Sequence, residues 1–133
     1  MYYQGDGMPQ DNAQAALLFE KAADQGQADA QFFLGNMYAS KDNAPAVLWY
    51  RKAADRGQTD AQYALGEMYA EGQGVPQDYV QAHMWLNLAA AHDDEVKLAT
   101  VARDDVAAKM TPDQIADAQR LAREWVQSHP STR

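Results

Sequence analysis

The sequence predicts an all-α fold in which pairs of helices are stacked as internal repeats. The segment 60–78 carries this prediction, because its parts return elsewhere in the chain. Residues 65–70 (LGEMYA) match residues 34–39 (LGNMYA), and residues 72–78 (GQGVPQD) match residues 5–11 (GDGMPQD). A chain that repeats itself in this way usually stacks one small structural unit. The many alanines of the chain also favour helices that approach one another closely.

The first helix of each pair is expected at residues 28–39 and 59–71, where apolar residues stand four positions apart on one face. Glycine at positions 35 and 66 would cost roughly 1 kcal/mol in a helix interior relative to alanine. The same cost at the same position of two repeats predicts that a neighbouring backbone approaches closely there.

The second helix of each pair is expected at residues 11–25, 43–56 and 78–91. Asp78 is a suitable N-cap for the last of these helices. Gly57 stands where a helix C′ residue in the left-handed region is wanted. Together with the first helices, these segments form repeats that extend over residues 1–93.

The remaining chain is expected to cap the open end of the stack, as repeat arrays require. One helix is predicted from His92 to about Met110, although its apolar residues do not define one clean stripe. A second helix should begin after Thr111, where a threonine N-cap and a glutamine at N3 complete a capping box. The capping pair is assigned to residues 94–128 and a tail to residues 129–133.

Composition excludes several classes of function. The hydrophobic content of 47% argues against disorder. The formal net charge of −8 argues against nucleic acid as a partner, because phosphate binding needs clustered lysine and arginine. Without cysteine there are no disulfides, thiolate metal sites or cysteine nucleophiles. No apolar run is long enough for a membrane-spanning helix, so membrane insertion is not expected.

The order Leu-Gly-x-Met-Tyr, Gly-x-Gly-Val-Pro-Gln-Asp and Ala-x-x-Trp-x-x-x-Ala-Ala resembles the bacterial type of the Sel1-like repeat family, a branch of the tetratricopeptide-like helical solenoids. The resemblance covers about residues 1–93. It implies an α/α superhelix, that is, a right-handed solenoid of antiparallel helix pairs. It also implies a scaffold for protein interactions rather than an enzyme.

Two repeats depart from this pattern. The second lacks the glycine-containing connector, and the first starts in the middle of its first helix. Met1 occupies the register of Met37 and Met68, which predicts that the chain belongs to a longer array. No signal peptide is visible in the sequence as written, which leaves the localisation unknown and would place the chain, taken as written, in the cytoplasm. A signal peptide upstream of Met1 would instead direct it to the periplasm or out of the cell.

The truncated first repeat also suggests a homodimer. Its second helix presents an apolar face whose usual partner helix is incomplete, so a second copy of the chain could cover it. The residues of this face are Ala15, Leu18, Phe19 and Ala22.

The candidate partner-binding residues lie on the variable face of the first helices. There an aromatic residue stands between polar residues with i, i+3, i+7 spacing, in two repeats. The six candidates are Asp29, Phe32, Asn36, Asp60, Tyr63 and Glu67. In a tetratricopeptide-like arrangement these positions line the concave side, and such a mixture is typical of peptide grooves. The alternative is that Phe32 and Tyr63 pack between neighbouring helices.

No motif in the chain supports catalysis, a metal site or a cofactor. The Gly-x-Gly segments lack the lysine and serine or threonine of a phosphate-binding loop, and they are better explained as turns. The sequence therefore predicts a scaffold that binds a protein or peptide on its concave surface. Two alternatives stay open: an enzyme or small-ligand binder whose site the sequence does not reveal, and a terminal fragment that caps or dimerises a longer array.

Overall fold

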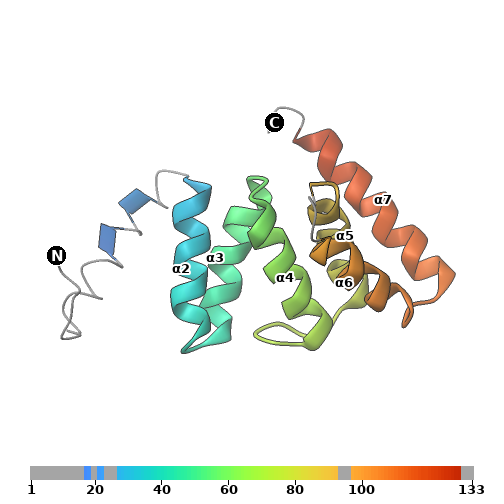
Figure 1. Cartoon of the computed structure of the whole chain (residues 1–133), viewed down its shortest axis with the longest axis horizontal. Helices are drawn as coiled ribbons and strands as arrows, with labels where there is room; N and C mark the ends of the chain where they lie inside the picture. The colour runs from blue at the N-terminus through green and yellow to red at the C-terminus, as the bar shows by residue number, and fades with distance from the viewer. Residues whose placement is uncertain (1–16, 19–20, 23–26, 93–96, 130–133) are drawn as a thin grey trace.

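The computed structural model describes residues 17–18, 21–22, 27–92 and 97–129. This part of the chain forms helices and no strands, which confirms the predicted all-α solenoid (Figure 1). Its helices are α2 (Ala28–Ala39), α3 (Asn43–Asp55), α4 (Thr59–Glu71), α5 (Tyr79–Ala90), α6 (Leu98–Ala107) and α7 (Pro112–Ser128).

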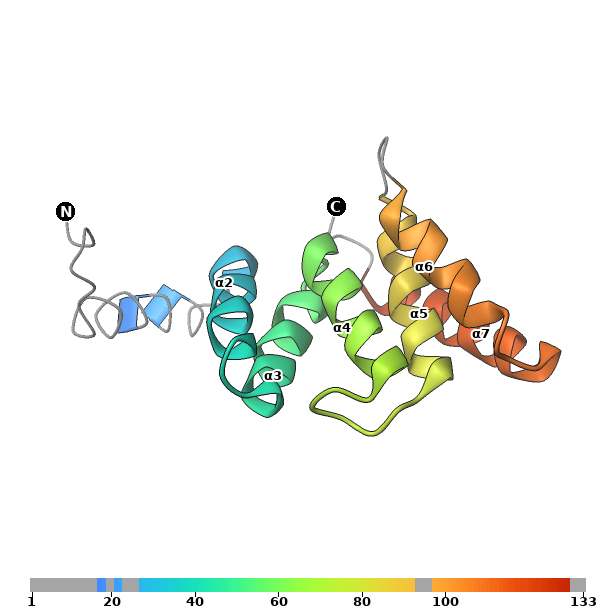
Figure 2. The same cartoon turned by 60° about the horizontal axis from the view of Figure 1, so that its bottom comes forward.

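Each helix packs on the next one along the chain, from α2 through to α6. The last helix breaks this order, because α7 returns to pack on α5 (Figures 1 and 2). Helix α5 is therefore covered by α4, α6 and α7, and it contributes a large share of the buried core. This position makes α5 the central support of the C-terminal half.

Three predicted helix ends, at Asp78, Thr111 and Gly57, are found at the expected residues. The Asp78 side chain accepts a hydrogen bond from the backbone N–H of Gln81 and caps α5. Thr111 and Gln114 form the expected capping box at the start of α7. Gly57 has a φ of 90°, the left-handed conformation expected after α3.

The connector between α4 and α5 forms an extended loop (Figure 2). Gly74 within it has a φ of 77° and lies against the first residue of α3. A Cβ at this position would be 2.6 Å from the backbone oxygen of Asn43, so both its conformation and its surroundings require glycine.

Two expected helices differ from the structure or lie outside it. The helix predicted from His92 to Met110 is shorter, because α6 begins only at Leu98. Lys97 has a φ of 59°, and a left-handed residue cannot continue a right-handed helix. The helix predicted at residues 11–25 lies mostly outside the described residues; its residues 17–18 and 21–22 are helical.

The nearest neighbours of the two helix glycines are side chains, and at Gly66 the expected neighbouring backbone is also close, since a Cβ there would be 3.2 Å from the backbone oxygen of Ala82. A Cβ on Gly35 would be 2.5 Å from the Tyr50 ring, and a Cβ on Gly66 would be 2.6 Å from Cγ of Leu86. Tyr50 and Leu86 occupy equivalent positions in their repeats. The repeat therefore places one large side chain of each second helix directly over the glycine of the preceding first helix.

Helix α7 is held by Trp125. The Trp125 ring meets the buried Trp85 ring edge-on, with centroids 6.2 Å apart, and it stacks on His129 at 3.9 Å. Its indole Nε1 donates a hydrogen bond of 3.0 Å to Oδ1 of Asp55, the last residue of α3. One side chain thus connects α7 to α5 and to α3.

His83 is buried in α5 and lies near two charged residues of α6. Burial lowers the pKa of its imidazole, and the positive charge of Arg103 lowers this pKa further, against an opposing effect of Asp104. Among the described residues Nδ1 of His83 has no hydrogen-bond partner. The folded chain therefore holds the neutral imidazole more favourably than the protonated one.

This environment predicts a loss of stability in mild acid. The pKa of His83 in the folded chain lies below the unfolded value of about 6.5, so the folded state binds fewer protons than the unfolded state. The stability that is present above the unfolded pKa is therefore lost as pH falls from there through the lower, folded pKa. We expect the free energy of unfolding in urea to fall between about pH 7 and about pH 5.5, and His83→Gln to reduce this slope. The matched control is His92→Gln, since His92 is exposed just after α5. Equal slopes for the two variants would contradict the prediction.

Candidate partner-binding cleft

The three candidate residues of α2 are engaged within the protein. Oδ1 of Asp29 accepts a hydrogen bond of 3.3 Å from Nε2 of Gln58. The Phe32 ring lies 5.8 Å from the Tyr50 ring, centroid to centroid. The Tyr50 hydroxyl donates a hydrogen bond of 2.5 Å to Oδ1 of Asn36. Burial raises the pKa of Tyr50, which keeps this hydroxyl protonated as a donor. These contacts fix the α2 set against α3 and α4.

Two of the three candidate residues of α4 line a cleft, and one of them, Tyr63, also packs against the core, as Phe32 does. Tyr63 and Glu67 are half-buried and line a cavity of about 350 Å³ between α4 and α6. We call this cavity the α4–α6 cleft. Asp60, the third residue of the set, is exposed in the first turn of α4 and is not part of its lining.

The contrast between the two repeats has a simple cause. Tyr50 of α3 donates a hydrogen bond from its hydroxyl to Asn36. The equivalent residue of α5 is Leu86, which has no hydroxyl group and cannot donate such a bond to Glu67. Glu67, the counterpart of Asn36, forms no ion pair within the part of the chain that the structure describes. Glu67 is one of the residues that line the cleft.

The opposite wall of the cleft is α6, and none of its residues was among the candidates predicted from the sequence. The lining residues of α6 are Leu98, Val101, Ala102, Asp105, Val106 and Lys109, the last just beyond the helix end. Two exposed aliphatic residues stand out, since Leu98 is 56% and Val101 57% exposed. The cleft therefore combines a half-buried aromatic ring, an exposed aliphatic edge and several charged groups.

The apolar pattern of α6 could have indicated this wall. Ala99 and Val106 are buried against the core, whereas Leu98, Val101 and Asp105 lie on a neighbouring stripe with i, i+3, i+7 spacing. The helix thus carries two adjacent stripes, and their overlap explains why the sequence shows no single clean one.

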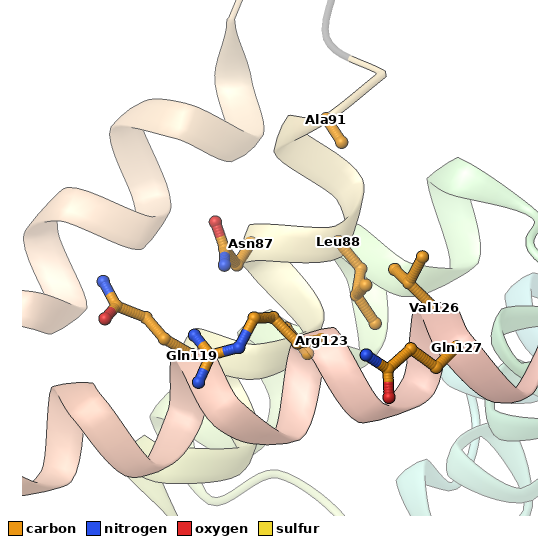
Figure 3. Close-up of a pocket in the computed structure, with 8 residues that line it drawn as sticks. Asn87, Leu88, Ala91, Gln119, Arg123, Val126 and Gln127 are labelled. Atoms are coloured by element: carbon orange, nitrogen blue, oxygen red, sulfur yellow. The ribbon is translucent and has the colours of Figure 1, made fainter.

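A second hollow lies between α5 and α7 and has a volume of about 530 Å³ (Figure 3). Leu88 of α5 and Val126 of α7 form its apolar part, and Arg123 is its charged residue. Asn87, on its edge, accepts a hydrogen bond of 3.0 Å from Nη1 of Arg103. None of the six candidate residues lines this hollow, and its described lining contains no aromatic side chain.

Three further expectations concern membrane insertion, metal binding and a homodimer. None of the described helices is long and apolar enough to cross a membrane. Among the described residues, no three histidine, aspartate or glutamate side chains are grouped so that they could hold a metal ion. Leu18 of the expected dimer face is exposed and Ala22 packs near Leu34, while Ala15 and Phe19 lie outside the described residues. The homodimer stays a prediction.

Comparison with known proteins agrees with this architecture. The family model for the Sel1 repeat matches residues 1–27, 28–58 and 59–94. The second of these matches contains α2 and α3, and the third contains α4 and α5. Repeats of this family typically serve as scaffolds for protein interactions. No curated protein matched the chain.

Two solved structures are similar to the chain. One is c5321, a protective antigen present in uropathogenic Escherichia coli strains that displays an SLR fold, with 35% identity and a TM-score of 0.84 over 96% of this chain. The other is a Sel1 repeat protein from Oxalobacter formigenes, with 26% identity and a TM-score of 0.59 over 89% of this chain. The chain spans 28% of the first and 64% of the second. With matched repeats over most of its length, the chain belongs to the Sel1 repeat family.

Proposed function

We propose that the chain is a non-catalytic scaffold that binds a peptide, or an exposed segment of a partner protein, in the α4–α6 cleft. Tyr63 and Glu67 are its principal contacts on α4, and Leu98 and Val101 are its principal contacts on α6. The cleft is open to solvent, as the binding of a continuing chain requires, and its volume of about 350 Å³ accommodates a few side chains.

The observation that carries the proposal is the difference between equivalent positions of two repeats. Asn36 accepts a hydrogen bond from Tyr50, whereas Glu67 forms no ion pair with any residue that the structure describes and lines an open cleft beside Tyr63. An aromatic ring that is half-buried beside aliphatic side chains loses little conformational freedom on binding and offers a large contact area. This combination supports binding at α4, while the internal contacts of Phe32 and Asn36 support a structural role for the α2 set.

The double variant Tyr63→Ala/Glu67→Gln tests the proposal. In affinity capture from the native cell, we expect it to retain its partner at least about tenfold less well than the wild type, which corresponds to about 1.4 kcal/mol of binding free energy. Quantitative mass spectrometry of the captured proteins provides the measurement, and thermal unfolding of each variant shows the effect on stability.

The matched control is Phe32→Ala/Asn36→Gln, which changes the equivalent positions of α2. This control should lower the melting temperature more, because it removes contacts with Tyr50, and it should leave capture unchanged. If the α4 variant loses as much stability as the control and captures the same partners, Tyr63 is a packing residue and the proposal is wrong.

A further inference from the structure

We infer that the segment bound in the α4–α6 cleft is cationic and aliphatic: it carries a lysine or arginine close to a leucine-, isoleucine- or valine-like side chain. This inference rests on the proposed function and adds to it the chemistry of the partner. It follows from the way in which apolar and charged side chains are distributed along the two walls of the cleft.

The two ends of the cleft differ in chemistry. In a solenoid of antiparallel helix pairs, α5 runs against both α4 and α6, so α4 and α6 run in the same direction. Residues near the start of both helices therefore lie at one end of the cleft, and residues near their C-terminal ends lie at the other. The first end holds Tyr63, Leu98 and Val101.

The other end of the cleft is negatively charged. Glu67, Glu71 and Asp105 line it, and Lys109 is the cation beside them. Nζ of Lys109 lies 6.0 Å from the centre of the Tyr79 ring, a position suited to a cation–π contact. None of the three carboxylates forms an ion pair with any residue that the structure describes.

These charges determine which partners the cleft accepts. A peptide that covers the half-buried Glu67 removes water from its carboxylate, and this is costly unless a cation takes the place of the water. An acidic peptide would meet three carboxylates and the overall charge of −8. A lysine or arginine at this end replaces the water lost from the Glu67 carboxylate and is attracted by the negative charges.

The apolar end selects an aliphatic neighbour for this cation. Leu98 and Val101 are more than half exposed, so a side chain that covers them together with Tyr63 removes apolar surface from water. The seven-residue step along the helix from Leu98 to Asp105 is a distance of about 10 Å. An extended peptide covers this distance in about three residues. The bound segment should therefore carry its aliphatic and its basic residue about three positions apart.

Selection from a phage-displayed library of random peptides, with the whole chain as bait, tests the inference. We expect the enriched peptides to contain the aliphatic–basic spacing. Fluorescence anisotropy of an enriched peptide should show at least about tenfold weaker binding to Glu67→Gln/Asp105→Asn, and weaker binding at higher salt. Asp104→Asn is the matched charge control on the same helix, outside the cleft lining, and should bind like the wild type.

A second pair of variants separates failure of the inference from failure of the proposed function. Val101→Trp obstructs the cleft, and Val126→Trp makes the same change at a similarly exposed position of α7. Peptides that bind in a Val101-dependent manner but carry no basic residue overturn the inference and leave the proposed function standing. If no peptide is enriched, or if Val101→Trp and Val126→Trp bind the enriched peptides equally, both are overturned. Circular dichroism confirms that each variant is folded.

Discussion

Gly66→Ala is expected to destabilise the wild-type chain and to stabilise a Leu86→Ala variant. In the wild type the new Cβ would be 2.6 Å from Cγ and 2.9 Å from Cδ2 of Leu86, a side chain that is fully buried. Overpacking of this kind costs roughly 1–3 kcal/mol. It outweighs the gain of about 1 kcal/mol that alanine brings to a helix interior.

The Leu86→Ala background reverses the balance. Removal of a buried leucine side chain costs roughly 2–5 kcal/mol, part of which is due to the cavity it leaves. The methyl group that Gly66→Ala adds in the double variant then enters this cavity, and the nearest remaining atom is the backbone oxygen of Ala82 at 3.2 Å. Only a small shift is needed there, so the helix-propensity gain of about 1 kcal/mol is largely recovered.

Urea unfolding of the four proteins of this double-mutant cycle measures the effect. A coupling free energy near zero would show that the glycine at position 66 does not serve contact with Leu86. It would also weaken the explanation of Gly35, whose neighbour Tyr50 occupies the equivalent position.

Trp125→Ala is expected to destabilise the chain by about 2–4 kcal/mol and to release α7. The substitution removes the edge-on contact with Trp85, the stacking on His129 and the hydrogen bond to Asp55. Urea unfolding gives the loss of stability, and hydrogen exchange followed by mass spectrometry shows whether the loss of protection is concentrated in residues 112–128.

The control for this prediction is Trp125→Phe, which keeps an aromatic ring and removes the indole N–H. Its expected cost is about 1 kcal/mol, the usual contribution of one hydrogen bond. Equal losses for the two variants would assign the role of Trp125 to its hydrogen bond with Asp55 rather than to its ring.

Much of the fold could be predicted because its signals are local and repeated. The caps at Asp78 and Thr111 and the left-handed Gly57 follow from residue type and position alone. The start of α6 could not be predicted in this way. Lys97 adopts a left-handed conformation that lysine does not favour by itself, so residue type gives no signal for the start of α6 at this position.

The candidate site was predictable only in part. The i, i+3, i+7 pattern selects Phe32 and Tyr63 equally. It cannot show that Asn36 accepts a hydrogen bond from the Tyr50 hydroxyl. Nor can it show that Glu67, whose counterpart of Tyr50 is Leu86, lines the cleft. The opposite wall was missed because Leu98 and Val101 lie beside the core-facing stripe of α6. The two repeats differ in their contacts between helices, and the spacing of residues along the sequence does not reveal these contacts.

The hydrogen bond between Trp125 and Asp55 spans 70 residues of sequence, a long separation in an array whose units mostly contact their nearest neighbours. Ordinary repeat arrays fray from their ends, one unit at a time. Detachment of α7 breaks contacts with α5 and with the end of α3 at the same time. The C-terminal half should therefore open as one cooperative unit, with a single transition where an open-ended array would show gradual melting.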